Sequence, residues 1–387
     1  MHPSIVRRIN ATRIFHTLRV NPGISQREIG ERTGVDKSTI SAIISHFDGI
    51  GLLERAADSV KGKRGRPGEA IRLKASAALI AGMHIEPERL RVVLSGLDGE
   101  PLRSSVSETP ASFQDIPGTL AAMLEALLGE EGPPVADVRS IGICVPGLIT
   151  ETGRVAESSN MQWHDLELQG VLATVFGAPV HVGNDGRGAA LAEKLFGACI
   201  PLDDYLYLDS NSGLGGALFL DGEIYRGAGG FAGEIGHVKI TSNGRLCACG
   251  ASGCVSAYLS EPALRRRFAQ VGRPVADFQA MRVLALAEDP AALAALDEAG
   301  EVLGVAVADL VNLLNPPAIV LGGGLAVLAE FLMPGLRRTL VRQALGSSLK
   351  LAEIIVSTLA REPVPRGGLA LALGGLSDPN GEGPFPW

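Results

Sequence analysis

A histidine and three closely spaced cysteines form the group of side chains in this sequence best suited to chemistry. Cys247, Cys249 and Cys254 lie close together in the chain, and His237 precedes them. Thiolate sulfur and imidazole nitrogen suit zinc, and four such ligands with no spare position are typical of a closed structural site. Intervening glycines allow the backbone to fold tightly around an ion. We therefore predict a structural Zn²⁺ site of the Cys₃His type; the alternative is a set of free, buried cysteines.

The cysteine pattern also indicates a cellular compartment. Three of the five cysteines are packed too closely for an ordinary disulfide framework, which favours metal binding in a reducing environment. Residues 1–10 lack the continuous apolar stretch of a signal peptide. The most apolar region, residues 303–336, is interrupted by polar and charged side chains before a membrane span can form. We expect a cytoplasmic protein with no membrane partner.

Charge is distributed unevenly along the 387 residues. The chain is longer than one hydrophobic core usually organises, so more than one domain is expected. Residues 1–74 hold 14 Lys and Arg against 7 Asp and Glu, a charge of +7, and the remainder carries −14. A basic segment on an acidic body suggests that only that segment meets nucleic acid. We divide the chain into a DNA-binding head with its linker, residues 1–74, and a body, residues 75–387.

The head has the pattern of a winged helix-turn-helix. An apolar face containing Ile14 and Leu18 ends before the Asn-Pro-Gly sequence at 21–23, which stops a helix. Ser25 and Glu28 form a capping box that starts a second helix over residues 26–33. After a turn at Gly34, apolar residues at helical spacing predict a recognition helix with small polar residues at its start.

Several side chains of the head are expected to contact double-stranded DNA. Hydroxyls and a lysine at the start of a recognition helix reach base edges and phosphates, and arginines between glycines can follow a minor groove. The alternatives are a generic helical hairpin and a merely solvated linker. The predicted DNA-binding residues are Ser25, Gln26, Lys37, Ser38, Thr39, Ser41, Lys63, Arg64 and Arg66.

The body repeats one order of elements. Strands are predicted over 79–85, 90–95 and 102–106, followed by a helix over 116–128 and a strand over 138–145. In the second half we expect strands over 205–208, 217–220 and 318–321, a helix after Ser256, and a long helix that contains 302–314. A duplicated β-β-β-α-β unit predicts two α/β lobes with a ligand cleft between them.

The sequence Gly233-Glu234-Ile235-Gly236-His237, followed by the spaced cysteines, resembles the signature of the ROK family of repressors and sugar kinases. The Val-Pro-Gly at 145–147, the Asn-Asp at 184–185 and the Leu-Gly-Gly-Gly at 321–324 fall in the family's order. This resemblance covers nearly the whole chain. It implies a two-lobed, actin-like and ribonuclease H-like sugar-kinase fold, and the head is typical of the family's repressors.

The resemblance also implies a sugar-like effector and its ligand-binding residues: Asn160, Asn184, Asp185, Glu234, His237 and Ser256. In the kinases, Asp185 would be the general base; here we expect it to bind only. Asn184 and Asp185 are alternatively a helix N-cap, and Glu234 alternatively supports His237. Ser256 stands where the family usually has a glutamate, which favours a pentose, a sugar derivative or another polyol over a standard hexose.

One phosphate loop of the kinases has no counterpart here. Their D-x-G-G-T-K sequence corresponds to the stretch from His84 to Arg89, in which Glu86, Pro87 and Glu88 supply bulk, a missing N–H donor and negative charge. A second glycine-rich loop, 212–216, is partly kept. No catalytic residue is predicted.

We therefore expect a transcription regulator, a repressor of sugar uptake or catabolism genes, that binds an inverted-repeat operator as a homodimer or tetramer. An active sugar kinase with an accessory DNA-binding head is one alternative, and a regulator controlled by protein docking is another. Activation instead of repression also stays open.

Overall fold

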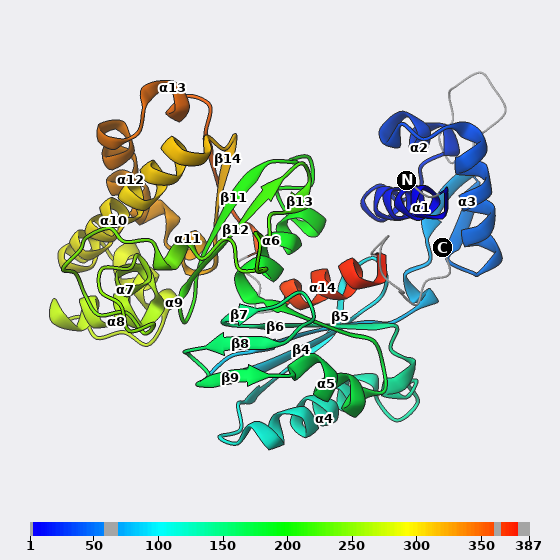
Figure 1. Cartoon of the computed structure of the whole chain (residues 1–387), viewed down its shortest axis with the longest axis horizontal. Coiled ribbons are helices and arrows are strands. Elements are labelled where there is room, and N and C mark those ends of the chain that lie inside the picture. Colours follow the sequence, from blue (N-terminus) through cyan, green and yellow to red (C-terminus); the bar gives the residue numbers. More distant parts are fainter. Residues whose placement is uncertain (1–2, 58–68, 360–364, 378–387) are drawn as a thin grey trace.

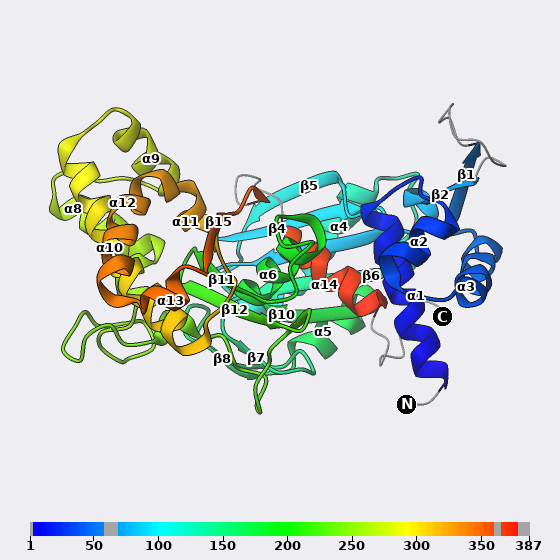
Figure 2. The ribbon, with the colours of Figure 1, turned by 90° about the horizontal axis from the view of Figure 1, so that it is seen from above.

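The computed structural model describes residues 3–57, 69–359 and 365–377, which form a small head and a body of two lobes (Figures 1 and 2). This confirms the predicted fold class, a winged helix-turn-helix followed by a two-lobed α/β body. Among the helices of these residues, none has the length and apolar character needed to cross a membrane. The domain boundary at residue 74 stays a prediction.

The head consists of α1 (Pro3–Val20), α2 (Gln26–Thr33), α3 (Lys37–Gly49) and the antiparallel strands β1 (Leu53–Ala57) and β2 (Glu69–Leu73). The predicted capping box is present: the N–H of Glu28 donates to Ser25 Oγ at 3.3 Å, and the N–H of Ser25 donates to the Glu28 carboxylate at 2.8 Å. Gly34 takes a left-handed φ of 69° in the turn before α3. The predicted bounds of the second helix are therefore confirmed. Three predicted DNA contacts, Lys63, Arg64 and Arg66, lie outside the described residues.

The first lobe is built on a five-stranded sheet with the order β10-β6-β3-β4-β5. Its strands are β3 (Ile80–Ile85), β4 (Arg89–Ser95), β5 (Pro101–Glu108), β6 (Ser140–Val145) and β10 (Val180–Asn184). One face packs through an apolar core on α4 (Ile116–Leu128) and α5 (Leu168–Phe176). A small antiparallel sheet of β7 (Leu148–Ile149), β8 (Val155–Ser158) and β9 (Trp163–Leu166) lies beside it.

The second lobe has the same topology, with the order β13-β12-β11-β14-β15. Its strands are β11 (Tyr205–Ser210), β12 (Leu214–Leu220), β13 (Glu223–Ile224), β14 (Ala318–Gly322) and β15 (Glu353–Val356). In both lobes the first three strands are antiparallel and the last two extend the sheet in parallel. The predicted duplication is confirmed.

A group of helices packs through an apolar core on one face of the second sheet. They are α7 (Ser256–Leu259), α8 (Glu261–Gln270), α9 (Phe278–Leu286), α10 (Pro290–Leu314), α11 (Gly323–Val327), α12 (Ala329–Gln343) and α13 (Gly346–Leu349). The predicted long helix is α10, and it packs along α12.

Two further helices join the parts of the molecule. α6 (Asp185–Phe196) packs against both sheets, and α14 (Arg366–Ser377) returns from the second lobe to lie on β3 and β6 of the first (Figure 1). Glycines permit this close approach, because a Cβ on Gly142 would lie 2.0 Å from the carbonyl oxygen of Gly368. The sequence analysis did not predict α14.

The head docks on the body where α1 meets the C-terminal end of α14 (Figures 1 and 2). Phe15 and Leu18 share a buried apolar cluster with Leu369 and Leu373. The Thr12 hydroxyl donates to the carbonyl oxygen of Ser377 at 2.6 Å, and His16 Nε2 lies 3.0 Å from the Ser377 hydroxyl. Helix α14, which follows the second lobe in the chain, thus also provides the surface of the body on which the head packs.

Candidate functional site

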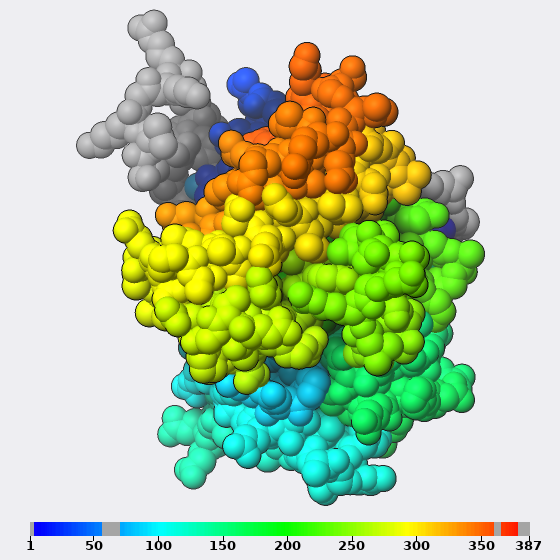
Figure 3. Space-filling model, turned by 90° about the vertical axis from the view of Figure 1, so that its left-hand side faces the viewer, coloured from blue at the N-terminus to red at the C-terminus, as the bar shows by residue number. Residues whose placement is uncertain are grey.

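The ends of parallel strands from both lobes converge at the middle of the body. In the first lobe β3 and β6 pair with His84 opposite Cys144, and β10 ends at Asn184. In the second lobe Asp209 of β11 lies opposite Gly322 of β14. Ligands of open α/β folds bind at such strand ends. Figure 3 shows the yellow and light green residues of the second lobe above the cyan residues of the first, with a hollow where they meet.

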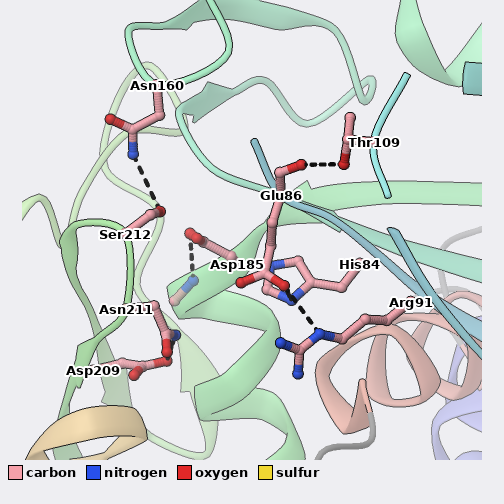
Figure 4. A network of polar contacts seen from close by, with 10 residues as sticks. His84, Glu86, Arg91, Thr109, Asn160, Asp185, Asp209, Asn211 and Ser212 are labelled. Atoms are coloured by element: carbon pink, nitrogen blue, oxygen red, sulfur yellow. Dashed lines mark hydrogen bonds and ion pairs between the residues drawn. The ribbon is translucent and has the colours of Figure 1, made fainter. Parts of the chain in front are cut away.

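A cavity of about 180 Å³ lies at this junction. Its lining includes His84, the acidic residues Glu86, Asp185, Glu193 and Asp209, and the basic residues Arg91 and Arg366. Figure 4 shows Asp185 at the centre of the network, with Glu86, His84 and Arg91 on one side and Asp209 with Asn211 on another.

Asp185 is the predicted ligand residue that lines this cavity. It occupies the first position of α6, where its Oδ1 accepts the backbone N–H of Gly186 at 2.8 Å. Burial raises the pKa of this carboxyl group, and the charge of Glu86 adds to the rise while His84 opposes it. Asp185 therefore presents a carboxyl group that binds protons and hydrogen-bond donors more readily than an exposed aspartate does.

Asn184 is the N-cap of α6, which is the alternative role that the sequence predicts for it. Its Oδ1 accepts the N–H of Arg187 at 3.0 Å and caps α6, and its Nδ2 donates to the carbonyl oxygen of Gly147 at 3.0 Å. With both polar atoms engaged, Asn184 positions Asp185. Its direct contact with a ligand stays a prediction.

Asn160 and Ser256 flank the glycine-rich loop that precedes β12. Asn160 Nδ2 donates to Ser212 Oγ at 3.3 Å, and the Ser256 hydroxyl accepts the N–H of Leu214 at 3.2 Å. A Cβ on Gly213 would lie 3.8 Å from Asn160 Nδ2 and 3.9 Å from Ser256 Oγ. The structure thus brings these two predicted ligand residues together around Gly213.

Glu234 lies close to a charged residue that the sequence analysis missed. Burial raises the pKa of its carboxyl group to about 7, while the charge of Arg187 opposes the rise and that of Asp185 adds to it. Arg187 is 6% exposed and donates to the carbonyl oxygen of Ala232 at 3.0 Å. Glu234 and Asp185 therefore share one electrostatic environment next to a buried guanidinium.

His237 and the three cysteines converge as the sequence predicts. All four ligand atoms lie within 4.8 Å of one another; His237 Nδ1 is 3.8 Å from Cys247 Sγ, and the sulfur atoms of Cys249 and Cys254 are 3.7 Å apart. A tetrahedron with Zn–S bonds of about 2.3 Å has edges of roughly 3.8 Å. The cluster therefore fits a zinc ion.

Neighbouring groups support this geometry. Gly253 has a φ of 79°, and a Cβ there would lie 1.7 Å from the carbonyl oxygen of Thr241, so the loop requires glycine. Lys239 Nζ lies 2.6 Å from Cys254 Sγ. Three thiolates and Zn²⁺ carry one net negative charge, which this ammonium group would balance.

The predicted DNA-binding surface begins at the start of α3. Lys37, Ser38 and Ser41 are exposed. The hydroxyls of Ser38 and Thr39 both donate to the Asp36 carboxylate, which caps the helix and whose pKa these bonds lower. Ser25 is likewise engaged in its capping box. Contacts of all these residues with DNA stay predictions.

The sequence analysis missed the acidic side of the cavity. The sequence predicts Glu86 only as an obstacle to phosphate and assigns no role to Asp209 or Arg91. Asp209 carried a usable signal, because it stands at the carboxyl end of a strongly apolar strand, where site residues of α/β folds gather. Arg91 gave no such signal in the sequence, because its place opposite His84 depends on strand register.

Comparisons with known proteins agree with this architecture. Residues 81–374 match the model of the ROK family, and residues 8–65 match that of the MarR family. The chain is 28% identical over 322 residues to the xylose repressor of Bacillus subtilis, covering 82% of this chain and 83% of the relative. Two solved structures are similar. One is a ROK family transcriptional regulator, a homolog of the E. coli MLC protein, with 26% identity, a TM-score of 0.80 and coverage of 97% of this chain and 98% of its own. The other is a ROK family glucokinase from Streptomyces griseus with glucose and AMPPNP, with 26% identity, a TM-score of 0.68 and coverage of 76% and 98%.

Proposed function

This chain belongs to the ROK family, and we propose that it is a DNA-binding transcriptional repressor whose body is controlled by a small sugar-like ligand and transfers no phosphate. The observation that carries the proposal is the shared apolar core of the head and α14, which ties a winged helix-turn-helix directly to the body. The similarity to a xylose repressor over most of both chains supports a sugar-responsive role.

Ligand control requires a physical connection between the cavity and the head, and α6 supplies one. Its first residue, Asp185, lines the cavity, and its last, Phe196, lies under the guanidinium of Arg19 at 4.9 Å from the ring centroid. Arg19 also donates to the carbonyl oxygen of Leu195. A ligand that moves α6 would therefore move the surface on which α1 rests.

A second connection runs through α14. Arg366 lines the cavity, and its guanidinium lies 5.7 Å from the centroid of the same Phe196 ring. The other end of α14 holds Thr12 and His16 of the head through Ser377. Coupling of about 1–3 kcal/mol between two sites changes an affinity roughly 5- to 150-fold, which is sufficient for a genetic switch.

The residues of the turn between β3 and β4 support the proposal that the body transfers no phosphoryl group. Glu86 donates its N–H to the carbonyl oxygen of Arg89 at 3.0 Å in a closed hairpin turn, and its carboxylate pairs with Arg91 at 3.1 Å. A nucleotide phosphate placed there would meet a carboxylate instead of a row of free backbone N–H groups. This arrangement supports binding without transfer.

Zinc is proposed as the resident ion of the His237 and cysteine cluster. The cluster lies between two predicted ligand residues in the chain, with Glu234 shortly before His237 and Ser256 shortly after Cys254. A metal held there would fix both positions on one side of the site and take no part in chemistry.

Two measurements on the full-length protein test this function. Footprinting on genomic fragments should find an inverted repeat, because paired heads on a symmetric dimer or tetramer read two half-sites. ATP consumption in the presence of monosaccharides should stay at the background rate. Sugar-dependent ATP turnover would favour the alternative of an active kinase with a DNA-binding head.

A further inference from the structure

The cavity between the lobes has an excess of acidic groups on its wall. Glu86 has a partner, because its carboxylate forms an ion pair with Arg91 at 3.1 Å. Arg366 is directed to other groups: it lies 3.6 Å from Glu100 and against the Phe196 ring. Asp185 and Asp209, one from each lobe, form no ion pair with any Lys or Arg in the part of the chain that the structure describes. The cavity therefore holds two carboxyl groups with which no Lys or Arg of the described residues forms an ion pair.

Asp209 also has an unused hydrogen-bonding atom. The residue is 6% exposed; its Oδ2 accepts from Asn211 Nδ2 at 3.1 Å, whereas its Oδ1 is buried with no hydrogen-bond donor. Across the cavity, His84 Nε2 is likewise buried without a partner. Buried polar atoms in native proteins are nearly always paired, so an unpaired one in a cavity wall is a candidate for contact with a bound group. Asp209 Oδ1 can therefore accept a hydrogen bond from a donor that enters the cavity.

We propose that this cavity binds the protonated amine of a small polyhydroxylated molecule, an amino sugar or a related amino polyol, with its ammonium group between Asp185 and Asp209. The inference deepens the proposed function, on which it rests because Asp185 belongs to both sites. An ammonium group offers three N–H donors and one positive charge, which supplies a donor for Asp209 Oδ1 and balances the carboxylates.

Other occupants fit this lining less well. A neutral sugar would satisfy hydrogen bonds and leave the two carboxyl groups without a counter-charge. Phosphates would be repelled by Glu86, Asp185 and Asp209. A directly bound metal ion needs converging ligand atoms, and in the described residues the one group of His, Cys, Asp and Glu that converges in this way is the His237 and cysteine cluster.

Two matched pairs of probes test the proposal on the full-length protein without DNA. The pairs are glucosamine with glucose and ethanolamine with ethylene glycol, at pH 7.5 and constant ionic strength. Phosphate buffer is needed, because Tris is itself a hydroxylated primary amine. The amine of each pair should raise the unfolding temperature and the neutral partner should raise it less, because a ligand that binds only the folded state stabilises it.

Substitutions of the two aspartates test whether the amine binds between them. Asp209→Asn should weaken glucosamine binding at least tenfold, because it removes one member of a buried charge pair. Asp185→Asn gives a second test with the same expected loss, should the first variant fold poorly. Glu353→Gln, which removes an exposed carboxylate at the start of β15 in the second lobe, should bind glucosamine as the unchanged protein does.

Several results would overturn the proposal. They are equal stabilisation by both members of each pair, full glucosamine affinity in the two aspartate variants, and Asp209-dependent stabilisation by MgCl₂ where neither amine binds. The proposed function has a separate test, which is the measurement of operator binding. Release of operator by a neutral sugar without amine binding would remove only this inference, whereas Asp209-dependent amine binding without any change in operator affinity would remove only the role of this site as effector site.

Discussion

The guanidinium of Arg19 in the DNA-binding head lies 4.9 Å from the centroid of the Phe196 ring in the body. Burial lowers the pKa of Arg19 to about 10, so the group stays charged at neutral pH although it is enclosed between the two parts. A cation on an aromatic face within about 6 Å is attracted by the ring. This contact is where the last turn of α6 touches the head.

We predict that Phe196→Ala reduces the coupling between ligand and DNA. Removing the ring leaves both guanidinium groups, Arg19 and Arg366, without the surface they share. Ligand affinity and operator affinity measured separately should stay within about threefold of the unchanged protein, whereas the ligand-induced change in operator affinity should fall about tenfold. Val341→Ala, at a 75% exposed position in the second lobe, is the control. An undiminished ligand response in Phe196→Ala would remove α6 from the connection.

The cysteine cluster gives a prediction about metal content. Purified protein should contain one zinc per chain, and Cys249→Ser should lose it and unfold at a lower temperature, because a site with three ligands holds the ion less tightly. Cys199→Ser is the matched control: this cysteine is buried outside the cluster, so the variant should keep its zinc. Zinc-free protein with all three cluster cysteines open to alkylation in the folded state would contradict the assignment.

The acidic cavity predicts a pH dependence of stability. Burial, together with Asp185 and Glu86, raises the pKa of Asp209 from its ordinary 3.8 to about 7. Between these values the folded state holds a proton that the unfolded state has lost, so the free energy of unfolding falls as pH rises from about 4 to about 7 and stays lower above that. Asp209→Asn has no such proton to lose. In phosphate buffer it should be about 1–4 kcal/mol more stable than the unchanged protein at pH 8, and the gap should close towards pH 4. A gap that is constant with pH would contradict the raised pKa.

Operator binding should depend on the start of α3. Lys37 is exposed there, and Lys37→Ala should weaken binding about 3- to 10-fold and make the salt dependence less steep by about one phosphate contact. Lys350→Ala removes an exposed lysine beside α13 in the second lobe and should change neither quantity. Equal effects of the two substitutions would mean that binding is governed by overall charge and not by the recognition helix.

Sequence patterns correctly predicted the structural features that are determined by residues close together in the chain. The capping box of Ser25 and Glu28 and the turn at Gly34 are decided by neighbouring residues, and the structure has them where the sequence placed them. The Cys₃His cluster was equally readable, because three of its members lie in one short loop.

Contacts between segments far apart in the sequence could not be predicted from such local patterns. The position of α14 on β3 and β6 depends on Gly142 and Gly368, which are more than 200 residues apart, and glycine alone does not reveal its partner. The pairing of Arg91 with Glu86 depends on strand register, and the meeting of Asp185 with Asp209 depends on how the two lobes close. Sequence reasoning therefore predicted a set of ligand residues through a family signature, of which Asp185 lines the cavity, and missed the acidic residues that surround Asp185 there.

We propose that a ligand bound between the lobes controls the head. This proposal is tested most directly by titrating monosaccharides and amino sugars into full-length protein bound to a fluorescent operator fragment, with anisotropy as the measure of operator affinity. At least one of these compounds should change operator affinity by 5- to 150-fold, and Asp185→Ala should abolish this response while operator affinity without ligand changes little. An unchanged ligand response in Asp185→Ala, or no response to any compound that measurably binds the protein, would contradict it.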